Sequence, residues 1–268
     1  MTFTDRVREV IDSSDSVLCV GLDPADSTSA MAAERFCTEL LEATLQHVCA
    51  VKPNIAFFER WGSEGLAALE RVLGRIPKDK LVILDAKRGD IGHTADAYAK
   101  MAFLHFDVDA VTVNPLMGED SVMPFLQWLE RGIFLLTRTS NPSAKDFMQL
   151  RIAGGDRLYE RIVEYGHAWD PGGCVGFVVG ATDADAISRV RHRAPSAPLL
   201  LPGVGAQGAD LTAAVIAGMD VNGSSFIVPV SRGLSAAPEG PTVAAERLRH
   251  ELNTVRQAHR SAVAKLTS

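Results

Sequence analysis

The stretch LVILDAKRGDIGHTADAYAK, residues 81–100, runs from an apolar segment through a dense group of charges into a helix-like segment. The unbroken apolar run 81–84 predicts a strand that is covered on both faces, and residues 93–106 predict a helix. A strand that leads into a helix is half of a βαβ unit, in which the strands are parallel. Between the two segments, two carboxylates and two cations lie within residues 85–90.

The same alternation continues along the chain. Eight apolar runs predict strands, at 16–23, 50–54, 81–87, 110–115, 132–137, 174–180, 198–203 and 224–230. Helix-like segments separate or follow them, at 33–48, 63–76, 93–106, 121–130, 154–169, 183–193, 209–218 and 243–265. Eight such repeats predict an α/β fold, a (β/α)8 TIM barrel. We found no linker-like tract, so we expect residues 1–268 to form a single domain; an open doubly wound sheet is the alternative.

The bulk composition narrows the class of protein. A net charge of -6, with 47% hydrophobic and 22% charged residues, is typical of a soluble globular protein and argues against a nucleic-acid partner. No apolar run reaches about 18 residues, and the first residues lack the pattern of a signal peptide, so we expect no membrane association. The four cysteines show no CxxC spacing, which favours reduced thiols in the cytoplasm.

Polar residues gather where the predicted strands end. In a parallel barrel the carboxyl ends of all strands meet at one mouth, where active sites lie. We therefore expect the following residues to converge there: Asp23, Lys52, Asn54, Asp85, Lys87, Asp90, Asn114, Thr139, Ser140, Gln207, Ser231 and Arg232.

The charges after the third strand suggest acid–base chemistry. Asp85 and Lys87 are two residues apart, so in a strand they share a face. Lys52, at the end of the neighbouring strand, and Asp90, just past the third, would extend the pair to a Lys-Asp-Lys-Asp network. Nearby carboxylates favour the charged form of a lysine, which suits a general acid. The alternative is a salt-bridge cluster that only closes the rim of the barrel.

A glycine-rich segment, LPGVGAQGADL (201–211), follows the seventh predicted strand. Its glycines match G-x-G-x-x-G, a motif of dinucleotide-binding sites. In such a site the motif follows the first strand, and an acidic residue at the end of the next strand binds the ribose. Here the motif follows the penultimate predicted strand, and Asp220 precedes the next strand instead of ending it, which argues against a dinucleotide. We therefore favour a site for a single phosphate group, as loops after strands seven and eight of barrels often form. Gln207 and Arg232 would supply its side-chain donors. The seven histidines show no metal-binding spacing, so no metal site is predicted.

Taken in order, several segments carry a resemblance to a known family. DAKRGDIGHT (85–94) is similar to the signature of the orotidine 5'-phosphate decarboxylases, in particular their bacterial type 2 subgroup. The supporting segments extend along nearly the whole chain: VGLDP (20–24), VKPNIAFFE (51–59), VTVNPLMG (111–118), TSNPS (139–143), GFVVGAT (176–182), LPGVGAQG (201–208) and VSRG (230–233). The resemblance implies a TIM barrel that converts orotidine 5'-phosphate to uridine 5'-phosphate, in de novo pyrimidine biosynthesis, without a metal or an organic cofactor.

The resemblance also implies roles for the charged residues. Lys87 would donate a proton to C6 of the pyrimidine, and Asp85 would lie near the departing carboxylate. Lys52 and Asp90 would complete the network and contact the ribose. Asp90 and Thr94 would reach into the site of a second subunit, which implies a homodimer with shared active sites.

The remaining assignments concern substrate binding. Asp23 would bond a ribose hydroxyl, Ser140 would contact the edge of the pyrimidine, and Gln207 and Arg232 would hold the phosphate. Asn54, at the end of the second strand, completes the predicted binding residues. Two rivals remain: a magnesium-dependent sugar-phosphate decarboxylase or aldolase on the same barrel with a similar D-x-K-x-x-D triad, and a non-catalytic barrel that binds nucleotides or phosphate.

Overall fold

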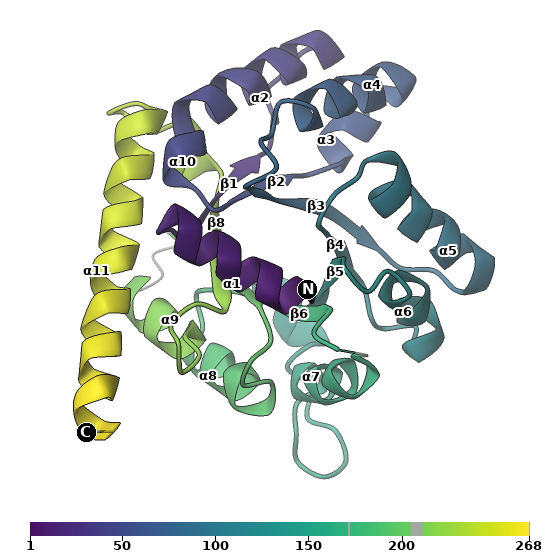
Figure 1. Ribbon diagram of the computed structural model, residues 1–268. Coiled ribbons are helices and arrows are strands. Elements are labelled where there is room, and N and C mark those ends of the chain that lie inside the picture. Colours follow the sequence, from purple (N-terminus) through teal and green to yellow (C-terminus); the bar gives the residue numbers. More distant parts are fainter. Residues whose placement is uncertain (171, 205–210, 268) are drawn as a thin grey trace.

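The strands close into a single barrel. A computed structural model describes residues 1–170, 172–204 and 211–267, with side chains up to residue 261. Within this part of the chain, each strand pairs in parallel with its sequence neighbours, and β8 pairs with β1 (Figure 1). The strands are β1 (Leu18–Leu22), β2 (Ala50–Pro53), β3 (Leu81–Arg88), β4 (Ala110–Val113), β5 (Gly132–Arg138), β6 (Val175–Val179), β7 (Leu199–Leu200) and β8 (Phe226–Val230). The predicted barrel is confirmed, and the open sheet is wrong.

Helices surround the barrel and connect its strands (Figure 1). The predicted helical segments correspond to α2 (Ala30–Thr44), α4 (Gly62–Leu73), α5 (Gly92–Lys100), α6 (Glu119–Leu126), α7 (Leu158–Trp169), α8 (Ala184–Arg193), α9 (Leu211–Gly218) and α11 (Pro241–Thr267). Helices that the sequence patterns did not predict are α1 (Phe3–Ser14) and the single turns α3 (Ala56–Glu59) and α10 (Arg232–Ser235). Shorter 3-10 and π segments are η1 (Leu45–His47), η2 (Met101–His105) and η3 (Pro142–Asp146).

The strands are apolar because both of their faces are covered. Every residue of β1, β2, β4, β5 and β6 is buried, and these strands share one hydrophobic core with the inner faces of the helices. Strand β3 is the exception, since none of its last four residues, 85–88, is buried. The polar end of β3 therefore emerges from the core at the mouth of the barrel.

Helix α1 closes the opposite end of the barrel. It lies across the barrel's centre in Figure 1, and its start is fixed by a capping box in which Thr2 and Asp5 bond each other's backbone N–H. The Phe3 ring is fully buried and meets Phe134 edge to face, with ring centroids 5.8 Å apart. A Cβ on Gly132, the first residue of β5, would lie 2.2 Å from that ring, so glycine makes room for Phe3.

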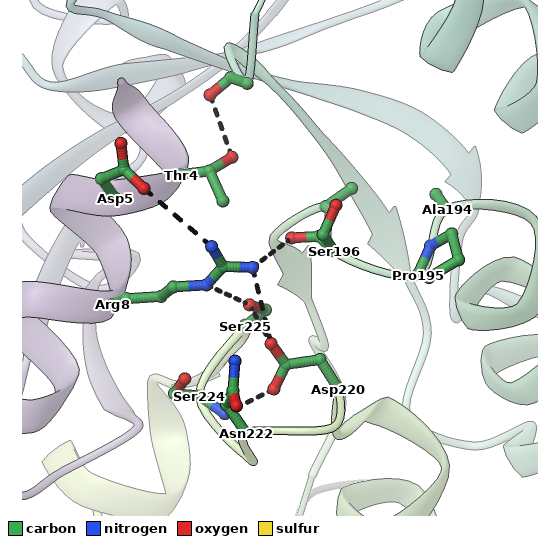
Figure 2. A network of polar contacts seen from close by, with 12 residues as sticks. Thr4, Asp5, Arg8, Ala194, Pro195, Ser196, Asp220, Asn222, Ser224 and Ser225 are labelled. Carbon is green, nitrogen blue, oxygen red and sulfur yellow. Dashed lines mark hydrogen bonds and ion pairs between the residues drawn. The ribbon is translucent and has the colours of Figure 1, made fainter. Parts of the chain in front are cut away.

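A polar network ties α1 to the loop between α9 and β8 (Figure 2). The Asp220 carboxylate accepts hydrogen bonds from the Ser224 N–H (2.9 Å) and the Ser225 hydroxyl (2.7 Å). Arg8 of α1 lies 3.6 Å from Asp220 and also donates to the Ser225 hydroxyl. Burial would raise the pKa of Asp220, but these donors, with Arg191 and Arg8, hold its pKa below its usual value. This network lies at the end of the barrel that is away from the mouth.

Across the described residues, none of the helices is both long enough and apolar enough to cross a membrane.

Candidate active site

The polar end of β3 is built on a β-bulge. Strand β3 pairs with β4 in regular register up to Leu84, which is opposite Val111, and the next matched pair is Arg88 and Val113. Three residues of β3, 85–87, thus face a single residue of β4, Thr112. Lys87 takes up the extra length with a φ of 48°, in the left-handed region that few residues other than glycine adopt. Bulges of this kind redirect side chains and are common beside active sites.

The redirected side chains form a compact charged group at the mouth. The Asp85 carboxylate accepts from the Lys52 ammonium on one oxygen (2.8 Å) and from the Lys87 ammonium on the other (2.6 Å). The Lys52 side chain is 8% exposed and that of Asp85 is 12% exposed, whereas that of Lys87 is 50% exposed. Asp85 therefore anchors a buried and an accessible cation at once.

The pKa values of the buried pair follow from these contacts. Burial alone would lower the pKa of Lys52, but the charges of Asp85 and Asp23 outweigh burial, so the pKa lies above its usual value. Burial alone would raise the pKa of Asp85, but Lys52 and Lys87 hold the pKa well below its usual range. Both Lys52 and Asp85 are therefore charged across the neutral range.

The charged group faces a cavity of about 280 Å³. Its polar lining comes from Lys87, Asp85 and Lys52, and from Ser140 with its neighbours Thr139 and Asn141. Its apolar lining comes from Leu136, Val178, Leu200 and Pro202. A flat, mostly apolar group with one negatively charged substituent would match this arrangement of surfaces.

A second cavity, of about 380 Å³, adjoins the first, because Lys52 and Pro202 line both. It contains Asp23 at the end of β1 and Arg232 after β8. One carboxylate oxygen of Asp23, Oδ1, is buried and has no hydrogen-bond partner among the described residues. An unpaired buried acceptor is costly, so a hydroxyl donor from a bound molecule would be stabilising there.

Ser140 is placed by a close approach between β5 and β6. The Gly180 N–H, just past β6, donates to the Arg138 carbonyl at 2.6 Å. A Cβ on Gly180 would lie 2.8 Å from the Ser140 Cα, so a glycine is needed for this contact. The Arg138 guanidinium also bonds the Gln149 amide oxygen (2.9 and 3.0 Å) once that amide is oriented to satisfy both groups, which ties down the segment after Ser140.

Three predicted residues that the structure describes, Asp90, Thr94 and Asn54, are not among those that line these two cavities. Asp90 is not part of the charged group: its carboxylate accepts from the Ile91 N–H at 2.8 Å. The expected four-membered network is thus three-membered within one chain. Thr94 is exposed on the first turn of α5, and Asn54 uses its amide oxygen to accept from the Ala56 N–H at the start of α3. Gln207 lies outside the described residues.

One residue at the centre of the site was missed from the sequence. Thr112 is 2% exposed and lines the 280 Å³ cavity. Its hydroxyl accepts from the Ala86 N–H of β3 and donates to the Asp85 carboxylate. Its position in AVTVNP, a polar residue inside an apolar strand and two residues before Asn114, is the signal that could have identified it. Over the described residues, no group of three or more His, Cys, Asp and Glu side chains is placed to hold a metal ion.

Comparison with known proteins agrees with this geometry. The model of the orotidine 5'-phosphate decarboxylase / HUMPS family matches residues 16–248. The orotidine 5'-phosphate decarboxylase of Roseiflexus sp. is 43% identical over 275 residues, which cover 96% of this chain and 100% of that protein. The enzyme of Verminephrobacter eiseniae is 44% identical over 254 residues, 90% of this chain and 92% of that protein.

Two solved structures are also similar to this chain, in both sequence and fold. The structure of Leishmania donovani OMP decarboxylase is 44% identical, superimposes with a TM-score of 0.89, and the match covers 96% of this chain and 99% of that one. The match to Leishmania donovani UMP synthase is 46% identical and covers 96% of this chain but 57% of that one. With a family model over most of its length and relatives above 40% identity, the chain belongs to the orotidine 5'-phosphate decarboxylase / HUMPS family.

Proposed function

We propose that this chain catalyses the decarboxylation of orotidine 5'-phosphate to uridine 5'-phosphate, a step of de novo pyrimidine biosynthesis. The observation that carries the proposal is the Lys87 ammonium, which is bonded to Asp85 and faces the 280 Å³ cavity. A cation that is already in place where negative charge develops stabilises the transition state without reorganisation.

In the proposed reaction, the bond between C6 and the carboxylate carbon breaks and carbon dioxide leaves. The electron pair of that bond stays on C6. The Lys87 ammonium stabilises this negative charge and then donates a proton to C6, which gives the product and a neutral amine. Water can restore the proton, because half of the Lys87 side chain is exposed.

Asp85 and Lys52 would hold Lys87 ready for this step. Asp85 receives both ammonium groups, which fixes the position of Lys87, and its own negative charge faces the cavity where the substrate carboxylate would lie. The strong pairing keeps Asp85 ionised, since its pKa is lowered, so repulsion between the two carboxylates would be relieved as carbon dioxide departs.

We assign the ribose and phosphate to the 380 Å³ cavity. Asp23, with its unpaired buried oxygen, would accept a hydrogen bond from a ribose hydroxyl. Arg232 would hold the phosphate, since it lines this cavity. Gln207 and Asn54 remain proposed contacts, and Ser140 would bond the edge of the pyrimidine from the first cavity.

We further propose a homodimer with shared active sites. Asp90 and Thr94 lie next to Ile91, which is 53% exposed, on the rim beside the charged group. Leu116 and Met117 are 57% and 46% exposed, and a Cβ on Gly89 would lie 3.2 Å from the end of Met117, so these apolar side chains adjoin the β3 end. Exposed apolar surface of this kind favours association, which would bring Asp90 and Thr94 to the partner's site.

Three further features are part of the proposal. Residues 1–268 act as one catalytic domain. The reaction needs no metal or organic cofactor, and it takes place in the cytoplasm. The four cysteines are free and buried, in keeping with a reducing compartment.

Turnover of orotidine 5'-phosphate, followed by the change in absorbance as the product forms, tests the proposed function. We expect turnover to be unchanged by a chelator. Loss of activity with the chelator and its recovery with Mg²⁺ would favour the magnesium-dependent rival. Binding of uridine 5'-phosphate without any turnover of the substrate would favour the non-catalytic barrel.

A further inference from the structure

The bulge in β3 leaves two backbone N–H groups without a strand partner. Because residues 85–87 face only one residue of β4, the ladder cannot supply a carbonyl for each of them. The two groups concerned are the N–H of Ala86 and the N–H of Lys87. Buried N–H groups without an acceptor are costly, so something other than the ladder must bond them.

The side chain of Thr112 is the acceptor for both. Its hydroxyl oxygen lies 3.0 Å from the Ala86 nitrogen and 2.9 Å from the Lys87 nitrogen. The same hydroxyl donates to Asp85 Oδ1 at 3.0 Å. A threonine hydroxyl has one donor and two acceptor sites, so its whole hydrogen-bonding capacity is used here.

These bonds act on both ends of Lys87. The bond to its N–H holds the backbone in the left-handed conformation, which is unfavourable for a residue with a side chain. The bond to Asp85 Oδ1 orients the very oxygen that receives the Lys87 ammonium at 2.6 Å. The Thr112 hydroxyl therefore helps to position both the backbone of Lys87 and the carboxylate oxygen that accepts from its ammonium.

We propose that Thr112 is the positioning residue for Lys87, and that the rate of the chemical step depends on its hydroxyl. This inference rests on the proposed function, because it takes Lys87 as the proton donor. A small displacement of a reacting group lowers the rate much more than it lowers binding, since binding of the phosphate and ribose relies on other residues. Removal of the hydroxyl should therefore reduce kcat and leave KM nearly unchanged.

Two substitutions of Thr112 distinguish the effect of its hydroxyl from the effect of its shape. Thr112→Val keeps the branched shape and removes the hydroxyl, whereas Thr112→Ser keeps the hydroxyl and removes a methyl group. Thr137→Val in β5 is the matched control. Thr137 is also a fully buried strand threonine, but its hydroxyl donates to the Leu135 carbonyl at 3.0 Å, and its neighbour Leu136 is the residue that faces the cavity.

The test is the steady-state turnover of orotidine 5'-phosphate by the full chain and these variants. We expect Thr112→Val to lower kcat by about 10- to 100-fold with KM within about threefold. Thr112→Ser should recover most of kcat, and Thr137→Val should match the parent protein. If Thr112→Val does not fold, Thr112→Cys, with a thiol that is a weak acceptor, should give a kcat well below that of Thr112→Ser.

Equal kcat values for Thr112→Val and Thr137→Val would overturn the inference, as would a Thr112→Ser variant as slow as Thr112→Val, or a Thr112→Cys variant as fast as Thr112→Ser. These results differ from a failure of the proposed function. In that case the unmodified protein itself would not turn over the substrate, whatever stands at position 112.

Discussion

At the scale of single residues, the site is governed by one carboxylate between two cations. The Lys52 side chain is only 8% exposed, and an isolated ammonium so deeply buried would be strongly destabilising. Asp85 offsets that cost while it also holds the accessible Lys87. The same carboxylate therefore has a structural task and a positioning task.

The stability of the Asp85→Asn variant, measured as a function of pH, should show how much the Asp85 charge contributes to folding. Because the pKa of Asp85 is lowered on folding, its charge contributes stability above the unfolded value of about 3.9, and the contribution is lost as the pH falls below that value. We expect the variant to lose about 3–5 kcal/mol of unfolding free energy at pH 7, since Lys52 is left without its partner. The difference from the parent should shrink below about pH 4. Urea unfolding of both proteins between pH 7 and the region below pH 4 measures this difference in unfolding free energy. A difference that stays constant with pH would contradict a stabilising charge on Asp85.

Gly180→Ala tests the placement of Ser140. The added methyl group would approach the Ser140 Cα at 2.8 Å, so Ser140 must shift from its present position at the cavity. We expect kcat/KM to fall by about 10- to 100-fold. Gly74→Ala is the matched control, because its methyl would meet nothing nearer than the Glu70 carbonyl at 3.5 Å. Equal activity in both variants would show that the contact does not place Ser140.

At the scale of elements, the two ends of the barrel do different work. The bulged end of β3 carries the charged group, while α1 closes the opposite end through Phe3 and the Arg8–Asp220 network. Catalytic residues of TIM barrels lie at the carboxyl ends of the strands, and the other end serves stability. Changes in α1 should therefore affect unfolding and leave catalysis unchanged.

Phe3→Ala puts this separation to the test. Phe3 is fully buried against Phe134, so its removal should lower the unfolding free energy by about 3–5 kcal/mol. At a temperature where the variant stays folded, kcat and KM should equal those of the parent. Met31→Ala in α2, at a side chain that is 73% exposed, should change stability by less than about 0.5 kcal/mol. A loss of kcat in folded Phe3→Ala would contradict the view that the end closed by α1 serves stability and not catalysis.

At the scale of the whole molecule, the barrel was predictable because its signal is repeated. Each covered strand reads as an unbroken apolar run, and eight runs with helices between them allow few other arrangements. The grouping of Lys52, Asp85 and Lys87 was predictable for the same reason, since strand ends meet at one mouth. Helix α1 was missed because no strand precedes it to mark a βα repeat.

Details that depend on strand register were not predictable. The bulge in β3 and the bonds of Thr112 arise from how β3 and β4 align, and nothing within either segment specifies that alignment. Asp90 follows Lys87 closely in sequence, yet its carboxylate accepts from the Ile91 N–H of its own chain. Residues whose proposed partners are in another subunit are not revealed by one chain's contacts.

A subunit-mixing experiment tests the proposed shared site. Lys87→Ala and Asp90→Ala subunits should each form inactive homodimers, but a mixed dimer has one site with both residues intact. We therefore expect the mixture to recover a fraction of the parent's activity after subunit exchange. No recovery, when exchange is proven by a size or affinity tag, would mean that each site belongs to one chain.

The most direct measurement is the turnover of orotidine 5'-phosphate by Lys87→Ala beside the unmodified protein. Because Lys87 is half exposed, its removal should leave the melting temperature within a few degrees and still allow uridine 5'-phosphate to bind. We predict no measurable decarboxylation by this folded, ligand-binding variant. Substantial turnover by Lys87→Ala would contradict the central claim that this ammonium stabilises and protonates C6.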